Sequence, residues 1–513
     1  MMTSLPGRIT SVLLPCSLFL IVVVRGFSLE SGDLLDPTET RYATIAQNMV
    51  QSGDWITARL PGEGGLRPYF SKPPLHFWLT ALSYKAFGFD EWTSRLPSFL
   101  ALVVIVACLL MLAFTFSSRE VGFLSAIICS SSPLLFFLAG SSTVDVTFTA
   151  TIISAITALS ISSFGADDDH PRLAGYLFFL FSALSFLTKG PAGLVIIGFT
   201  LVSSVILTRE WRIFSRLPWI GGLALFVLVA LPWFALVEQS NPGALWYYFV
   251  HENFLRYLKN DFGTQYGSAH NRPLGSIWWM VCLAVLPWVL YSLFYLKTVK
   301  RAWGEVRREP VFLMLLCLGL CPLIFFTFAR SVLPAYTLPS IPGLAYVLAA
   351  VLAHAKVHPE LSSEASSRFS LPHRREHFFR IPVLGLGLSV IMIGGLLVVA
   401  PQLEIEKSSS ELLEMVARET RGKKPIVATT SLRDLSPFWT GGAFENELVK
   451  ELRIVFANEE DIRSGRFRHL IVRDKRLEEG LFKELERHYR KRKTVGKWHW
   501  YVREGERAEL ASS

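Results

Sequence analysis

The sequence predicts a polytopic α-helical membrane protein that ends in a small α/β domain. Hydrophobic residues make up 51% of the 513 residues, and the mean hydropathy of +0.38 is higher than soluble domains carry. Apolar runs of about 20 residues, the length that crosses roughly 30 Å of hydrocarbon, recur as far as residue 401. Beyond that residue the composition becomes charged.

Eleven apolar runs are long enough to be transmembrane helices. They lie near residues 9–27, 95–116, 121–140, 143–164, 173–188, 191–208, 217–238, 274–297, 311–329, 332–354 and 380–401. The first run follows Arg8, as the core of a signal peptide would, but no small-x-small cleavage site precedes Arg25 and Gly26. We therefore predict about eleven spans, the first of them uncleaved.

Basic residues between the spans indicate which ends face the cytoplasm, because Lys and Arg accumulate there. With eleven spans, three basic clusters share the face of Arg8: Arg209, Arg212 and Arg216; Lys297, Lys300, Arg301, Arg307 and Arg308; Lys356, Arg368, Arg374 and Arg375. The sequence thus predicts a multi-pass protein of the plasma (inner) membrane with a cytoplasmic N-terminus. Loops 28–94 and 239–272, and everything after residue 402, should be extracytoplasmic. Contact with an anionic inner leaflet accounts for the net charge of +9 better than nucleic acid does.

The first outer loop should contain two amphipathic helices at the membrane surface. From Thr38, apolar residues recur at helical spacing until Gly53, which ends the pattern. Glycines and prolines between Leu60 and Pro68 predict a flexible turn. Pro73 and Pro74 then open a second helix with an interfacial pattern.

Residues 402–513 predict a separate extracytoplasmic α/β domain, and residues 1–401 the transmembrane catalytic domain. The smaller domain shows helical patterns at 408–421 and 477–489, apolar runs PIVAT, LRIVFA and HLIVR, and a final strand near TVGKWHWYV. It contains no evident catalytic constellation. We expect it to shape the substrate site or bind a partner.

Carboxylates and cations recur at the outer ends of the predicted spans. They are Asp36, Glu39, Arg41, Lys72, Asp145, Lys189, Arg256, Arg272 and Arg330. Charged groups beside lipid are costly unless they pair or bind a polar ligand. Outside the membrane there is no ATP, and no Gly-rich phosphate loop occurs in the cytoplasmic segments. A group-transfer reaction at this face therefore needs a lipid-borne donor.

At these residues the chain resembles the polyprenyl-phosphate-sugar dependent glycosyltransferases of the GT-C membrane fold, which include the ArnT-like aminoarabinose transferases of lipid A and the protein O-mannosyltransferases. The matching stretches are TETRYATIAQNM and SGDWIT, YFSKPPLHFWL, the Asp145 site, LTKGPAG, LPW, HENFLRYL, HNRP and LPAYTLP. They occur in order between about residues 30 and 340. The branch of the superfamily stays open.

The resemblance implies an inverting transfer of a sugar from polyprenyl phosphate to a lipid A-like glycolipid or a protein. It implies that Asp36, Glu39 or Asp145 assists the acceptor. The implied donor phosphate-binding residues are Arg41, Lys72, Lys189, Arg256, Arg272 and Arg330. Other implied cavity residues are Tyr42, Tyr69, His270 and Tyr336.

Four positions depart from the pattern of the aminoarabinose branch. Thr38 stands where an Asp is usual and Ser71 where an acid precedes the lysine; Val332 replaces a Lys, and Asn253 an expected His. A metal site built from these positions is not implied, and neither is any cofactor besides the lipid-linked donor. All six cysteines lie within predicted spans, so a disulfide framework or thiol zinc site in the outer loops is excluded.

Simpler interpretations compete with a catalytic one. Glu39 and Arg41 could form an ion pair on a surface helix, and Lys72 and Lys189 could be snorkelling side chains at span ends. A lipid or sugar transporter or flippase would also contain intramembrane charges, but these usually lie near the midplane. Here they gather at one face. A receptor or scaffold would not explain the set of carboxylates and cations.

Overall fold

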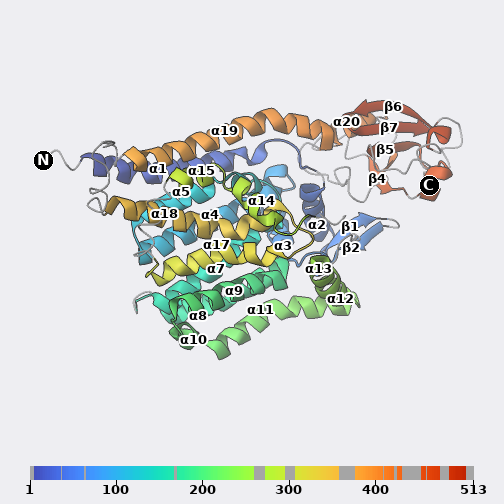
Figure 1. Cartoon of the computed structure of the whole chain (residues 1–513). Helices are drawn as coiled ribbons and strands as arrows, with labels where there is room; N and C mark the ends of the chain where they lie inside the picture. The colour runs from blue at the N-terminus through green and yellow to red at the C-terminus, as the bar shows by residue number, and fades with distance from the viewer. Residues whose placement is uncertain are drawn as a thin grey trace.

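A computed structural model gives the architecture of the chain (Figure 1). It describes residues 5–35, 37–62, 65–166, 170–258, 272–294, 307–357, 376–407, 409–420, 425–429, 452–457, 459–473 and 485–503.

Nine helical segments within the described residues are long and apolar enough to cross a membrane. They correspond to α1 (Leu5–Phe27), α4 (Glu91–Phe116), α7 (Val144–Phe164), α8 (Pro171–Lys189), α9 (Pro191–Thr208), α11 (Trp219–Ser240), α17 (Pro310–Thr327), η4 (Pro334–Ser340) with α18 (Ile341–Val357), and α19 (Glu376–Lys407). The chain is thus a multi-pass membrane protein. The short α10 (Arg212–Arg216) lies at the end opposite the site described below.

The two other predicted spans are each made of two shorter helices. Residues 121–140 form α5 (Arg119–Ser130) and α6 (Pro133–Leu138), and residues 274–297 include α14 (Ser276–Ala284) and α15 (Trp288–Phe294). A proline adjoins each break, because Pro133 is the first residue of α6 and Pro287 directly precedes α15. Proline cannot donate a backbone hydrogen bond to the preceding turn. The helical segments match the sequence expectation, whereas the count of eleven spans stays a prediction.

Helix α7 forms the centre of the bundle, and 89% of its apolar window is buried. It packs against α4 and α8, which lie on either side of it (Figure 1). Its buried face combines small and β-branched residues, among them Ala155, Ile156 and Thr157. Small residues allow helix backbones to approach closely in a membrane. Because Asp145 lies in the first turn of α7, it is mounted on a well-packed helix.

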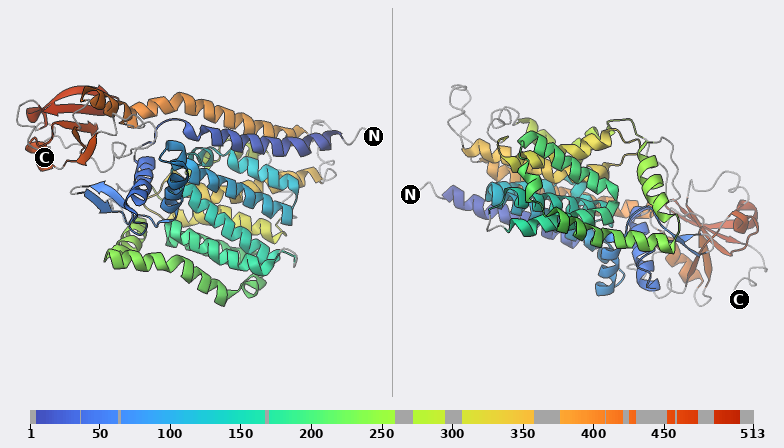
Figure 2. Two further views of the ribbon diagram at one scale, coloured as in Figure 1. Left: turned by 180° about the vertical axis from the view of Figure 1, so that it is seen from behind. Right: turned by 90° about the horizontal axis from the view of Figure 1, so that it is seen from below.

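The first outer loop folds over one end of the bundle. It contains α2 (Thr38–Ser52), β1 (Arg59–Gly62), β2 (Gly65–Pro68) and α3 (Leu75–Phe87). Helices α2 and α3 lie across the ends of the spans rather than along them (Figure 2). As predicted, α2 ends at Gly53, which has a φ of 73° that glycine tolerates better than other residues.

The prediction of a flexible turn between Leu60 and Pro68 is wrong for the described residues there, because residues 59–62 and 65–68 pair as two antiparallel strands. Leu60 pairs with Arg67 in that hairpin. Just before the hairpin, Asp54 Oδ1 accepts hydrogen bonds from the backbone N–H groups of Ile56 at 3.0 Å and Thr57 at 2.9 Å, which orders this segment. Glycine and proline marked the chain reversal but did not reveal the backbone pairing.

The C-terminal region has a five-stranded sheet in the order β4-β3-β5-β7-β6. Its elements are α20 (Ser410–Glu419), β3 (Ile426–Thr429), β4 (Arg453–Phe456), α22 (Glu459–Arg463), β5 (His469–Arg473), β6 (Tyr489–Val495) and β7 (Trp498–Arg503). Strands β3, β4 and β5 are parallel, and β7 is antiparallel to β5 and β6. The apolar runs PIVAT, LRIVFA and HLIVR therefore form strands, as predicted.

The end of the chain differs from expectation. TVGKWHWYV was expected to contain one strand, but Gly496, with a φ of 55°, divides it between β6 and β7. Most of the predicted helix at 477–489 lies outside the described residues; residues 485–488 are helical and β6 begins at Tyr489. The C-terminal sheet lies at the same end of the bundle as α2 and α3 (Figure 2). Which compartment that end faces stays a prediction.

Candidate active cavity

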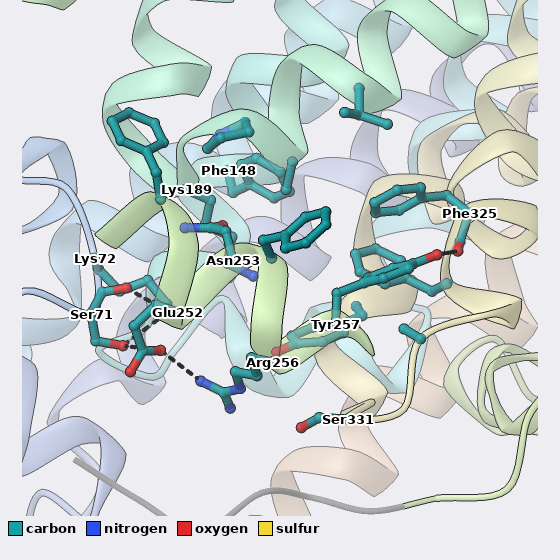
Figure 3. A pocket seen from close by; sticks show the side chains of 18 of the residues that line it. Ser71, Lys72, Phe148, Lys189, Glu252, Asn253, Arg256, Tyr257, Phe325 and Ser331 are labelled. Carbon is teal, nitrogen blue, oxygen red and sulfur yellow. Dashed lines mark hydrogen bonds and ion pairs between the residues drawn. The ribbon is translucent and has the colours of Figure 1, made fainter. Parts of the chain in front are cut away.

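A cavity of about 570 Å³ opens where the first outer loop meets the ends of the spans. Its lining combines charged groups with an aromatic and aliphatic wall (Figure 3). The lining residues include Ser71, Lys72, Phe148, Lys189, Pro191, Ala192, Val195, Tyr248, Phe249, Glu252, Asn253, Phe254, Arg256, Tyr257, Leu258, Phe325, Phe326 and Tyr336. An ionic group with an apolar chain would find complementary surfaces in one space.

Lys189 and Asp145 form a partly buried ion pair at one side of the cavity. Lys189 is the last residue of α8, and Asp145 lies in the first turn of α7. The Lys189 Nζ lies 5.0 Å from the ring centroids of both Phe148 and Tyr336. Thr143 donates a hydrogen bond to Asp145 Oδ2 at 3.0 Å. These contacts fix the carboxylate beside the cavity, although Asp145 itself is not among the lining residues.

The turn after Lys189 depends on glycine. Gly190 has a φ of 64°, and a Cβ atom there would lie 2.1 Å from the Tyr248 hydroxyl oxygen. The absence of a side chain therefore lets the turn between α8 and α9 pack directly against Tyr248. This contact explains the glycine of LTKGPAG in terms of cavity shape.

Glu252 and Arg256 form a second ion pair, with 3.1 Å between Glu252 Oε2 and Arg256 Nη1. Glu252 belongs to η3 (Tyr247–Leu255), a π-helix followed by α13 (Arg256–Leu258). Its carboxylate also accepts hydrogen bonds from Ser71 at 3.1 Å and Tyr247 at 3.2 Å. Glu252 was not among the site residues predicted from the sequence, although its spacing of four residues from Arg256 is typical of a helical ion pair.

Lys72 supplies a third cation. Unlike Lys189 and Arg256, it does not form an ion pair with any described carboxylate. Its Nζ donates to the Ser71 carbonyl at 2.9 Å and to the Ser71 hydroxyl at 3.3 Å. Burial lowers the pKa of Lys72 to about 8; Arg256 and Lys189 act in the same direction, while Glu252 and Asp145 oppose it. Across the described part of the chain, no carboxylate lies within ion-pair distance of Lys72.

Two of the predicted cavity tyrosines lie behind the charged groups. Burial raises the pKa of Tyr69, while the neighbouring Arg41 and a hydrogen bond with Ser71 oppose that shift. Burial also raises the pKa of Tyr42, and Asp145 adds to the effect. Both phenols therefore stay neutral near pH 7. Arg41 lies close enough to Tyr69 to affect its ionisation but does not line the cavity.

His76 is a buried polar residue that the sequence analysis did not select. Its Nδ1 lies 3.0 Å from the Thr147 hydroxyl, and its ring is 5.9 Å from that of Tyr42. Burial lowers the pKa of His76 to about 4. The imidazole is therefore neutral near pH 7 and adds no charge beside Asp145.

Glu39 lies in a structural network outside the cavity lining. Its Oε1 is 3.1 Å from Arg95 Nε and accepts a hydrogen bond from the Ser142 backbone at 2.9 Å. Its Oε2 accepts from the Leu35 backbone at 3.1 Å. The alternative of a surface ion pair between Glu39 and Arg41 is therefore wrong, because the partner of Glu39 is the buried Arg95.

Of the remaining predicted site residues, some lie outside the described residues, some lie away from the cavity lining, and one lines the cavity. Asp36 and His270 lie outside the described residues. The backbone N–H of Arg272 donates to the Arg330 carbonyl at 3.3 Å, and that of Arg330 donates to the Tyr257 carbonyl at 3.1 Å. Neither arginine lines the cavity, but Tyr336 does.

The departures from the family pattern can also be located. Ser71 donates to Glu252, Asn253 lines the cavity, and Val332 is buried. In the described segments, no three side chains of His, Cys, Asp or Glu are grouped so that they could hold a metal ion.

Sequence comparisons give two kinds of match. Residues 71–235 match the family described as dolichyl-phosphate-mannose-protein mannosyltransferase. The undecaprenyl phosphate-alpha-4-amino-4-deoxy-L-arabinose arabinosyl transferase of Pseudomonas aeruginosa is 32% identical over 348 residues, which cover 65% of this chain and 58% of the relative. The corresponding transferase 2 of Proteus mirabilis is 29% identical over 357 residues, 68% of this chain and 60% of the relative. The match thus spans less than two thirds of either relative.

Solved structures establish the fold over nearly the whole chain. ArnT from Cupriavidus metallidurans, in a crystal structure bound to undecaprenyl phosphate, superposes with a TM-score of 0.74 at 20% identity, covering 97% of this chain and 98% of that one. The archaeal oligosaccharyltransferase AglB from Archaeoglobus fulgidus gives a TM-score of 0.52 at 12% identity, covering 90% and 69%. The chain has the GT-C fold. Within that class it resembles the aminoarabinose transferases in both sequence and architecture.

Proposed function

We propose that this protein is a glycosyltransferase of the inner membrane that moves a sugar from a polyprenyl-phosphate carrier to a glycolipid on the extracytoplasmic face. The observation that supports this most directly is the charge of the cavity. Three cations, Lys72, Lys189 and Arg256, face two carboxylates, Asp145 and Glu252. One positive charge remains for an anionic ligand such as a donor phosphate.

The reaction that fits this arrangement is a single displacement at the anomeric carbon. A bond forms between an acceptor oxygen and that carbon, while the bond to the phosphate oxygen breaks and its electron pair leaves with polyprenyl phosphate. Charge on the phosphate grows in the transition state, so cations fixed in advance stabilise that state more than the ground state. Lys72, Lys189 and Arg256 are the proposed phosphate ligands, with Arg41, Arg272 and Arg330 as outer contributors.

A hydroxyl acceptor must also lose a proton, and a carboxylate can accept it. General-base assistance is worth about 10²–10⁴-fold in rate. We place Asp145 first because it lies beside the cavity and is held by Lys189 and Thr143. Glu39 ranks lower because Arg95 and two backbone donors engage it. Asp36 is a third candidate from the sequence.

The acceptor class rests on the relatives. The arabinosyl transferases named above support a lipid A-like glycolipid as acceptor. The mannosyltransferase description of the matched family makes a protein acceptor the second candidate. Comparing glycolipid and glycoprotein mass spectra from cells with and without the gene separates the two. A mass shift confined to glycoproteins would replace the first candidate with the second.

Transfer itself can be measured with purified protein in nanodiscs, an undecaprenyl-phosphate sugar and lipid A as acceptor. Asp145→Asn and Lys72→Ala should retain the fold and lose at least about 100-fold in turnover, because each removes a proposed participant in the displacement. Lys85→Ala is the matched control, since Lys85 is exposed on α3 and lies over the Trp55 ring, away from the cavity lining.

Full activity in both cavity variants would refute the assignment of Asp145 and Lys72. A transporter or flippase would instead move the lipid-linked sugar across the bilayer without forming a new glycosidic bond. The clustering of charged groups at one end of the bundle favours transfer over that alternative.

A further inference from the structure

The carboxylate of Glu252 engages hydrogen-bond donors at the charged side of the cavity. Its side chain is only 1% exposed and lines the cavity between Ser71 and Arg256 (Figure 3). Its Oε2 atom accepts hydrogen bonds from both of these residues, at 3.1 Å each, and Oε1 accepts from Tyr247 at 3.2 Å. The carboxylate therefore already satisfies part of the donor set that a phosphate would use.

Lys72 is linked to the same carboxylate through Ser71. The Lys72 ammonium donates to both oxygens of Ser71, whose hydroxyl in turn donates to Glu252. Arg256 contacts Glu252 directly. A phosphate binding between Lys72 and Arg256 would thus be drawn to both cations and repelled by the buried charge of Glu252.

This inference rests on the proposed function and concerns the end of its reaction. The departing polyprenyl phosphate carries more negative charge than the sugar-linked donor, so the three cations would hold the product more tightly than the substrate. Tight product binding slows turnover when release limits the rate. A fixed carboxylate that can re-form its pair with Arg256 opposes this.

We propose that Glu252 is a positioning residue that acts as a counter-ion for product release. Its carboxylate competes with polyprenyl phosphate for Arg256 and for the Ser71 hydroxyl that adjoins Lys72. When the product leaves, the Glu252–Arg256 pair closes again. Glu252 makes no bond to the sugar and takes no proton in this scheme.

The test uses the full-length protein in nanodiscs with undecaprenyl phosphate as the binding probe. Glu252→Gln keeps the shape of the side chain and removes its charge. We expect it to bind undecaprenyl phosphate about ten-fold more tightly than the wild type, since hydrogen bonds to charged groups are worth enough to change affinity by that factor. The steady-state kcat and KM should fall together, with a burst in the first turnover.

The control is a Glu–Arg pair with the same four-residue spacing, away from the cavity. Glu414 and Arg418 form a pair four residues apart on α20, with 3.0 Å between Glu414 Oε2 and Arg418 Nη2, and the Arg418 side chain is 67% exposed. Glu414→Gln should leave product affinity and turnover unchanged. Glu252→Asp, which retains the charge, should keep product affinity near that of the wild type.

A merely structural role for Glu252 predicts the opposite sign, because a distorted cavity binds its ligand less well. The double variant Glu252→Gln/Arg256→Gln removes both charges and leaves no buried ion unpaired, so it provides a second test if the single variant fails to fold. In the Arg256→Gln background, the added Glu252→Gln change should tighten binding by a smaller factor than in the wild type, because one of the two competed donors is gone.

The possible results separate two failures. If the wild type does not bind undecaprenyl phosphate, the proposed function fails and this inference falls with it. If the wild type binds but Glu252→Gln binds equally well or more weakly, the counter-ion role is wrong while the proposed function stands. If Glu252→Gln tightens binding by the same factor in the Arg256→Gln background as in the wild type, the counter-ion role is also wrong.

Discussion

At the scale of single residues, Lys72 links the chemistry of the cavity to pH. Burial lowers its pKa from 10.5 to about 8, so the ammonium form prevails below that pH and declines above it. Between about pH 8 and pH 10.5, more of the Lys72 side chain is protonated in the unfolded chain than in the folded protein. By linkage, Lys72 therefore makes the fold more stable, not less, as pH rises from about 8 to 10.5.

We accordingly expect kcat/KM for the donor to fall as pH rises through about 8, without unfolding. Lys72→Arg keeps a positive charge at every accessible pH and should remove this alkaline limb, although its larger head lowers the maximal rate. The pH profile of donor turnover provides the measurement, with circular dichroism as the check on folding. Lys85→Arg is the control. An alkaline limb unchanged in Lys72→Arg would assign the titration to another group.

Gly190 illustrates how a backbone conformation can shape a site. Gly190→Ala must place a Cβ 2.1 Å from the Tyr248 hydroxyl oxygen at a φ of 64°, so it should destabilise the fold by more than about 1 kcal/mol and weaken donor binding by displacing Lys189. Gly198→Ala is a matched control in α9, where a Cβ meets no atom within 4 Å. Thermal denaturation in detergent and donor titration test both. Equal melting temperatures for the two variants would contradict the close packing.

Only some of the residues that line the cavity could be predicted from the sequence. Motif order selected Lys72, Lys189, Arg256 and Tyr336, all of which line the cavity. Glu252 was missed because one acidic residue in a loop has no periodic signal of its own; only its contacts with Ser71, Tyr247 and Arg256 distinguish it. The contact with Ser71 joins residues 181 positions apart, which no local pattern can anticipate, whereas the four-residue spacing from Arg256 was a local signal that could have been used.

At the scale of secondary-structure elements, the Glu39–Arg95 pair joins α2 to α4. Arg95 also donates hydrogen bonds to the carbonyls of Leu29 at 2.8 Å and Gly32 at 2.9 Å, and Glu39 reaches the Ser142 backbone just before α7. One buried ion pair thus holds three parts of the outer end together. The pairing of Glu39 with Arg95 could not be predicted from the sequence, because Arg95 was assigned to the predicted span at 95–116 rather than to the outer loop.

Glu39→Gln would leave Arg95 buried without a carboxylate. Breaking such a pair costs about 3–5 kcal/mol, so we expect a clearly lower melting temperature in detergent, with turnover lost as the outer loop loosens. Glu414→Gln removes the half-buried carboxylate that pairs with the exposed Arg418 on α20, and it should not change the melting temperature. If Glu39→Gln keeps the wild-type melting temperature and still loses turnover, the proposal of Glu39 as an acceptor base gains over the structural role.

Element prediction succeeded where hydrophobic period and end signals agree. The stop at Gly53 and three strands of the C-terminal sheet followed from such local agreement. It failed where pairing between segments decides the structure, as in the β1–β2 hairpin and in the division of the last apolar run at Gly496. Strands β6 and β7 lack the strict alternation that marks a half-buried strand.

At the scale of the whole molecule, composition alone separated the membrane part from the C-terminal sheet, because lipid and water select opposite residues. The fold of the bundle was inferred from motif order, and the similarity to ArnT over 97% of the chain supports that fold. The relative placement of the two parts depends on how α19 emerges from the bundle, which no local signal encodes.

The length of α19 has a consequence for the space above the membrane. Its 32 residues extend about 48 Å at 1.5 Å per residue, whereas the hydrocarbon core is about 30 Å thick. A helix crossing upright would project roughly 18 Å beyond the core. This extra length brings the C-terminal sheet to the level of the outer loop, where Leu413 and Trp500 share a buried apolar cluster with Met49 of α2. Helix α19 is therefore a spacer that lets the two parts of the chain pack together beyond the hydrocarbon core.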